Sequence, residues 1–198
     1  MTYPDLYLMR HGQTLWNAEQ RMQGRLDSAL TELGKTQAAA LAPLVAPVEG
    51  QRWASPQGRA MATADLVFAG SDYRTDPRLV EIDVGDFSGH RFDDLRTRHP
   101  ETFAGDHWAW YDRAPNGEHF AGLEARVRSF LDELQGPAVI VTHGITLRMM
   151  RLVAMGRSVA QIGELPLEQG AVHIVRSGQH ETWRVDPLKS APPPDPAG

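Results

Sequence analysis

Apolar residues along the chain form two patterns, short continuous runs and longer segments in which they recur at helical spacing. The runs 5–10 and 138–142 are typical of strands, and the second is apolar enough to be buried. From residue 123 onward, apolar positions recur at i, i+4, i+7, i+8 and i+11, which predicts an amphipathic helix. Together the patterns predict strands over 5–10, 51–54, 138–142, 171–177 and 180–185, and helices that begin near residues 31, 55, 123 and 145.

Residues that favour helix ends give the expected boundaries. A helix rich in alanine begins at about Thr31, and Pro43 ends or kinks it. Ser55 is expected to cap the next helix, with Pro56 at its first position and Gly70 at its end. The chain therefore alternates between strands and helices.

This alternation indicates a three-layer α/β/α sandwich. Its central sheet is expected to be mostly parallel, with an antiparallel edge from a closing hairpin that turns at residues 178–179. A single domain over 1–186 accounts for the pattern, with the polar segment of about 90–117 inserted as a lid of short helices and loops. The Pro-rich tail, 187–198, is expected to be disordered.

Composition narrows the classes of function. The 198 residues are 41% hydrophobic and 23% charged, as in ordinary globular proteins, and the net charge of −5 argues against nucleic-acid binding. Without cysteine there is no disulfide, thiolate metal site or cysteine nucleophile. No apolar run approaches the roughly 18–20 residues of a membrane span, and no signal peptide is visible, so a cytoplasmic protein is expected.

Three polar residues lie shortly after predicted strands. In open α/β sheets the functional crevice lies outside the carboxyl ends of the strands. His11 and His143 follow their strands directly, and Arg59 comes one turn after its strand. Taken singly, each residue is more often part of a turn, a cap or a solvated surface, but those readings do not predict that all three share one sheet edge.

The residues at this edge suit a phosphate monoester, which is nearly dianionic and needs several hydrogen-bond donors. Arg10 and Arg59 offer planar forks for bidentate contacts, and the backbone N–H groups of Gly12 and Gly144 add fixed dipoles. The pattern therefore favours an anion site.

A neutral imidazole is a competent nucleophile near pH 7, which makes His11 or His143 the candidate. Glu81 could then protonate the leaving oxygen. Metal catalysis is the chemical rival, but no H-E-x-x-H or comparable spacing is present and two arginines would repel a cation. Neither a metal nor a cofactor is expected.

Five ordered blocks resemble one known family. "LYLMRHGQTLWN" looks like the strand-plus-RHG signature of the histidine phosphatase (phosphoglycerate mutase-like) superfamily. In the family's order, "RMQGRLDSALTELGKTQA", "SPQGRAMATA", "LVEIDVGDFSG" and "VTHGITLR" follow. The resemblance runs from about residue 5 to residue 176 and implies a phosphoglycerate mutase-like fold.

The resemblance also implies residue roles. It makes His11 the nucleophile that becomes a phosphohistidine through Nε2, and Glu81 the proton donor that later activates water. The remaining residues of the implied phosphate and substrate pocket are Arg10, Arg59, His143, Asn17, Gln23, Gly144 and Thr14.

The residues that follow Glu81, the implied proton donor, indicate the branch of the family. Related mutases typically continue with Arg-His-Tyr-Gly, whereas this chain continues with Ile82-Asp83-Val84-Gly85. The short acid block is similar to broad-specificity and α-ribazole phosphatases, although His119 replaces a small residue there. We therefore expect a metal-independent phosphomonoesterase of the histidine acid type that acts on small phosphorylated metabolites. The alternatives are a cofactor-dependent phosphoglycerate mutase and a catalytically idle phosphate-binding scaffold, and a homo-oligomer is left open.

Four ring-bearing residues of the 90–117 segment, namely His107, Trp108, Trp110 and Tyr111, have two readings. They either line a lid that accepts the leaving group or pack this segment onto the domain.

Overall fold

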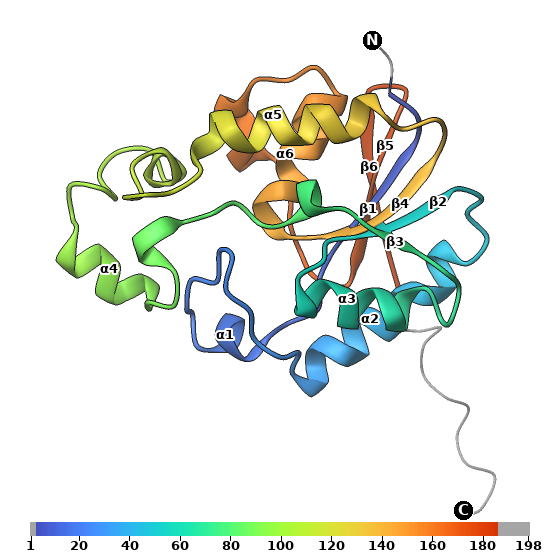
Figure 1. Cartoon of the computed structure of the whole chain (residues 1–198), viewed down its shortest axis with the longest axis horizontal. Coiled ribbons are helices and arrows are strands. Elements are labelled where there is room, and N and C mark those ends of the chain that lie inside the picture. Colours follow the sequence, from blue (N-terminus) through green and yellow to red (C-terminus); the bar gives the residue numbers. More distant parts are fainter. Residues whose placement is uncertain (1–2, 186–198) are drawn as a thin grey trace, which may run out of the picture.

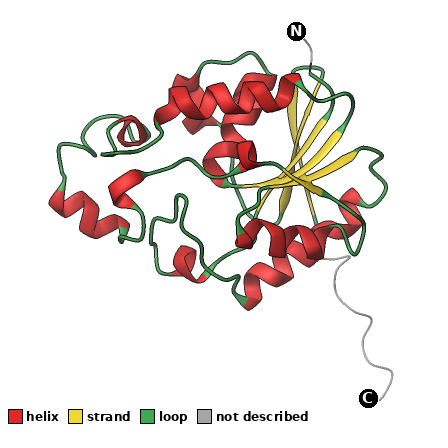
Figure 2. Ribbon diagram, in the orientation of Figure 1, coloured by secondary structure: helices red, strands yellow, loops and turns green. Residues whose placement is uncertain are grey.

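The computed structural model describes residues 3–185, which form one six-stranded sheet between two layers of helices (Figures 1 and 2). Four strands are parallel, and the last two add an antiparallel edge beside β1. The predicted α/β/α class and mixed sheet are confirmed. In the order β3-β2-β4-β1-β5-β6, the strands are β1 (Leu6–Arg10), β2 (Gln51–Ala54), β3 (Arg74–Thr75), β4 (Ala138–Thr142), β5 (Ala171–Arg176) and β6 (Gln179–Arg184).

Helices cover both faces of the sheet. Figure 1 shows α5 and α6 on one side and α2 and α3 on the other. In the view of Figure 1, α1 and α4 lie away from the sheet, with α4 at the far left of the molecule. The helices are α1 (Leu15–Ala18), α2 (Glu32–Val45), α3 (Gly58–Val67), α4 (Phe92–Arg98), α5 (His119–Asp132) and α6 (Gly144–Ala154).

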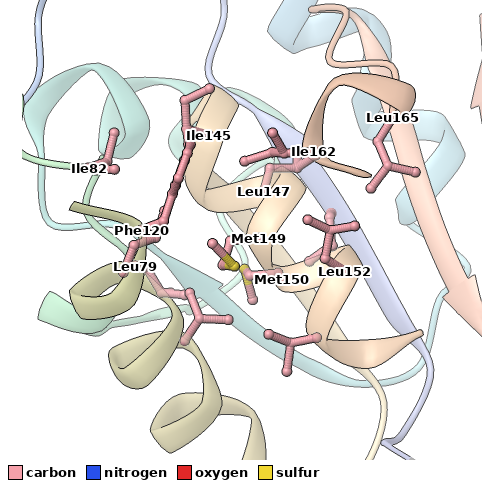
Figure 3. Packing of buried hydrophobic residues seen from close by; sticks show 14 of the residues in the cluster. Leu79, Ile82, Phe120, Ile145, Leu147, Met149, Met150, Leu152, Ile162 and Leu165 are labelled. Carbon is pink, nitrogen blue, oxygen red and sulfur yellow. The ribbon is translucent and has the colours of Figure 1, made fainter. Parts of the chain in front are cut away.

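Alternation along β1 divides the interior into two cores. Leu6 and Leu8 are buried with the residues of α5 and α6, whereas Tyr7 and Met9 are buried with those of α2 and α3. In the first core the apolar side chains of α6 pack against those of neighbouring segments (Figure 3). Because both faces are covered, β1 is apolar up to Arg10 and β4 up to Thr142.

Two expected helix ends are wrong. Pro43 does not end α2, which continues to Val45, because a proline in the last turn removes only one backbone hydrogen bond; the alternative, a kink at Pro43, stays a prediction. Ser55 does not cap α3, which begins at Gly58 after Gln57. The hydroxyl of Ser55 instead lies 2.7 Å from a ring nitrogen of His143.

Two other boundaries shift, and one short helix was not predicted. The helix expected from residue 123 begins at His119, because the segment before it packs Phe120 into the core. The final turn is Ser177-Gly178, where φ is 50° and 73°, so the turn falls one residue before its expected place. The one-turn helix α1 was missed because four residues carry no periodic pattern.

Within 90–117 the structure has the expected short helices and loops, namely α4 and a 3₁₀ helix at Ala109–Asp112. The role of this segment as a lid stays a prediction, as does the single-domain boundary. The tail 187–198 lies outside the described residues. In the part of the chain that the structure describes, no helix has the length and apolar character needed to cross a bilayer.

Candidate active site

His11 lies at the point where β1 leaves the sheet. Its neighbour Arg10 pairs with Thr142, the last residue of β4, and the backbone N–H of His11 donates to Thr142 O at 2.9 Å. His143 follows β4 directly, so the two imidazole rings meet with centroids 5.2 Å apart. Parallel strands in register thus bring together two histidines that are far apart in the sequence.

Hydrogen bonds assign the tautomer of His11. Its Nδ1 lies 2.8 Å from Gly12 O, a carbonyl that can only accept, so Nδ1 carries the proton. The lone pair of Nε2 then accepts from Arg59 Nε at 3.3 Å. Burial, followed by the charges of Arg10 and Arg59, holds the pKa of His11 well below its ordinary value. His11 is therefore neutral, with Nε2 as its basic atom.

Arg59 is held rigidly from the loop that precedes α2. Its Nη1 donates to Leu26 O at 2.7 Å and to Asp27 Oδ1 at 3.0 Å, and its Nη2 donates to Gly24 O at 3.0 Å. The same carboxylate accepts from the backbone N–H of Arg59 at the start of α3. A buried guanidinium with these partners is fixed in orientation before any ligand binds.

Arg10 keeps donor capacity. Its Nη1 makes a long contact of 3.4 Å with Leu167 O, and its Nε is buried without a partner among residues 3–185. Burial lowers the pKa of Arg10, although the charge of Glu81 opposes this shift. Gly144 lies against the guanidinium, where a Cβ would be at an ordinary contact distance of 3.5 Å from Arg10 Nε. Arg10 can therefore bind an anion without giving up a strong bond.

Glu81 is fixed by the N-terminus of α6. Its Oε1 accepts from the backbone N–H groups of Ile82 at 2.9 Å and Thr146 at 3.1 Å. Among residues 3–185, its Oε2 accepts only from the N–H of Ile145, at 3.2 Å. Glu81 thus accepts from two free N–H groups in the first turn of α6, and Oε2 remains the oxygen with room for a proton.

His143 lies fully buried beside His11. Its Nε2 is bonded to Ser55 Oγ, and its Nδ1 has no partner within residues 3–185. Burial, followed by the charge of Arg59, lowers the pKa of His143 well below its ordinary value. A neutral ring of this kind offers polar contact without adding a full charge.

A cavity of about 130 Å³ joins these groups. Of the residues predicted for the site, Arg10, His11, Arg59, Glu81, Asn17 and Gln23 line it. His143, Gly144 and Thr14 do not, and the hydroxyl of Thr14 is used to cap α1 by accepting from the N–H of Asn17. The other lining residues are Arg21, Met22, Gly24, Ile82, Val84 and Tyr111.

The model of the histidine phosphatase superfamily (branch 1) matches residues 6–189. The chain belongs to this family. A protein of Enterobacter sp. (strain 638) named "Probable phosphoglycerate mutase GpmB" is 34% identical over 168 residues, which are 76% of this chain and 74% of that one.

Two solved phosphatases share the fold of this histidine phosphatase. The mycobacterial glucosyl-3-phosphoglycerate phosphatase, solved with VO3, superposes with a TM-score of 0.79 at 27% identity, over 92% of this chain and 100% of that one. The α-ribazole phosphatase of Shigella flexneri gives 0.76 at 25% identity, over 91% and 95%. The predicted family, its phosphoglycerate mutase-like fold and its phosphatase class are confirmed.

Several residues of this histidine phosphatase site were missed from the sequence. Asp27 orients Arg59, and Gln57 accepts from the N–H of Glu81 at 2.8 Å while it donates to Gly24 O at 3.0 Å. Gln169 donates to His11 O at 3.1 Å and to Asn17 Oδ1 at 3.2 Å. All three act through backbone or loop contacts, which no periodic pattern reveals.

No group of three or more His, Asp or Glu side chains within residues 3–185 is placed to hold a metal ion.

Proposed function

We propose that this histidine phosphatase hydrolyses phosphate monoesters of small metabolites through a phosphohistidine on His11. The observation that carries the proposal is the neutral ring of His11, whose Nε2 lies beside the Nε of Arg59 in a cavity that Arg10 also lines. Two guanidinium groups bind the nonbridging oxygens of the ester, and the basic nitrogen between them attacks phosphorus.

The first step forms the Nε2–P bond and breaks the P–O bond to the leaving group. The departing oxygen takes a proton from Glu81, whose Oε2 has room to carry one. In the second step Glu81 takes a proton from water, the water oxygen bonds to phosphorus and the N–P bond breaks. Inorganic phosphate leaves, and His11 returns to its neutral form.

The cavity wall favours hydrolysis over mutase chemistry. Ile82 and Val84, which follow Glu81 in the chain, line the cavity at positions where the related mutases have basic and aromatic residues, whereas Arg21 and Tyr111 reach the cavity from other segments. The mutase alternative keeps one supporting observation, the likeness to the Enterobacter protein.

A panel of phosphorylated metabolites tests the proposal. The expected result is release of inorganic phosphate that a chelator leaves unchanged and that His11→Ala abolishes. Phosphoglycerate interconversion, primed by a bisphosphoglycerate and faster than phosphate release, would instead establish the mutase. Chelator-sensitive turnover would establish a metal mechanism, and no turnover on any ester would favour a binding scaffold.

We also propose a cytoplasmic location, which fractionation of the producing cells tests. The proposed partner is a small phosphorylated metabolite, which the same metabolite panel tests. A homo-oligomer is left open, and sedimentation of the purified chain decides it.

A further inference from the structure

Of the four ring-bearing side chains between residues 107 and 111, Tyr111 is the one that lines the cavity. Trp110 is only 4% exposed and packs with Phe87 and Phe103 in the core. Trp108 lies under the guanidinium of Arg148, 4.2 Å from its ring centroid. The two readings of this segment therefore separate by residue, since both tryptophans pack and Tyr111 reaches the site.

The ring of Tyr111 is held in place. It stacks on Trp110 with ring centroids 3.8 Å apart, and it also packs against Phe120 at 5.6 Å. Tyrosine hydroxyls in such surroundings usually find a hydrogen-bond partner. Within residues 3–185 no hydrogen bond to the hydroxyl of Tyr111 is found. A rigid ring thus lines the cavity, and the bonding capacity of its hydroxyl is unused.

Tyr111 lines the same cavity as Glu81 and Arg10, so the three side chains share one wall or face one another across it. Burial raises the pKa of Tyr111 strongly and the charge of Glu81 adds to the rise, while Arg10 and Arg148 oppose it. The phenol is therefore neutral at physiological pH and available as a donor. In the proposed hydrolysis Glu81 protonates the leaving oxygen, so the leaving group departs from a cavity that Tyr111 also lines.

The cavity is small, which brings a bound ester close to the side chains that line it. Its volume of about 130 Å³ is well below the 300–1,000 Å³ typical of sites that enclose a whole ligand. Besides the phosphoryl group it has room for only the nearest part of the leaving group, whose contacts are then with lining side chains such as Tyr111, Ile82 and Val84.

We propose that Tyr111 determines specificity: its hydroxyl donates a hydrogen bond to an oxygen that the leaving group carries close to the ester, which favours oxygen-rich esters over plain alkyl phosphates. This inference rests on the proposed hydrolysis. The acceptor is a hydroxyl or a carboxylate oxygen of the leaving group. The two acceptors differ in how much specificity is lost when the hydroxyl of Tyr111 is removed.

Three esters and the variant Tyr111→Phe test the inference. Glycerol 3-phosphate carries a neighbouring hydroxyl, phosphoglycolate a neighbouring carboxylate, and propyl phosphate neither. The measured quantity is kcat/KM for each oxygenated ester divided by kcat/KM for propyl phosphate. In Tyr111→Phe we expect this ratio to fall about 5-fold for a hydroxyl acceptor, or about 30-fold for a carboxylate, from typical neutral and charged hydrogen bonds.

The matched control is Tyr3→Phe, which removes a hydroxyl that donates to Asp132 on the surface. It should leave both ratios as in the wild type, and an unchanged unfolding midpoint in both variants shows that the fold is intact. Equal losses on all three esters in Tyr111→Phe, or no loss on any, would overturn the specificity role. If the wild type hydrolyses none of the esters, the proposed function fails before the variant is considered.

Discussion

Replacing Glu81 by Gln keeps the shape of the side chain and removes the proton that the leaving oxygen would take. The amide oxygen can take the place of Oε1, which accepts from the N–H groups of Ile82 and Thr146. The amide nitrogen then takes the place of Oε2 and faces the N–H of Ile145, so that two donors meet. One buried N–H loses its acceptor, which costs about 1–3 kcal/mol of unfolding free energy.

The kinetic effect of Glu81→Gln should depend on the leaving group. Proton transfer by a positioned acid is worth about 10²–10⁴-fold, and an alkoxide needs that proton as it departs. We therefore expect the first step on an alkyl phosphate to slow by about that factor. The first step on 4-nitrophenyl phosphate should slow far less, because its phenolate leaves without a proton.

Burst kinetics on both esters, for the wild type and the variant, separate phosphorylation from dephosphorylation. The control is Glu133→Gln, a surface change at a carboxylate that pairs with Arg78. An equal loss in the phosphorylation step on both esters would refute the acid role of Glu81. Glu118 would be a poor replacement, because it is bound to Arg126 at 2.6 Å and does not line the cavity.

Three further predictions concern the nucleophile, its arginine and the buried histidines. His11→Ala should abolish turnover and remove the alkali-stable phosphoenzyme that a rapid quench without acid traps in the wild type; label on His143 would reverse the assignment. Asp27→Asn should lower kcat/KM about 10-fold, because Arg59 loses its charged anchor and keeps two carbonyl partners; an unchanged value in steady-state assays would show that the carbonyls alone hold it. Burial lowers the pKa of His11. Burial, followed by the charge of Arg151, lowers the pKa of His180 to about 4. Below about pH 6.5 the unfolded chain therefore binds protons that the native chain does not. Stability should therefore fall as pH falls from 6.5 toward 4, by up to about 1.4 kcal/mol per pH unit for each such histidine, and urea titrations that show stability constant over this range would contradict the reasoning.

The sequence by itself determined the layers and the sheet edge at which the site lies. The strand at 138–142 and the strand at 51–54 have the bounds that their patterns predicted. The strand at 138–142 is predicted well because a parallel strand that is covered on both faces reads as a continuous apolar run, whereas the strand at 51–54 is mostly half-buried and has no such run. The polar residues directly after such strands, His11 and His143, follow from the same signal and from the geometry of parallel strands.

Only the tertiary structure decided what each side chain of the site contacts. Serine is a common helix cap, yet the hydroxyl of Ser55 bonds to His143. The two residues are 88 positions apart in the sequence and meet because β2 and β4 are paired in the sheet. Thr14 was expected at the substrate and caps α1 instead. The sequence did not show which of Tyr111 and Trp108 lines the site and which packs the segment. The structure does, because Tyr111 lines the cavity and Trp108 packs on Arg148. Local patterns record which residues avoid water, whereas the choice among polar partners depends on segments that meet only when the chain has folded.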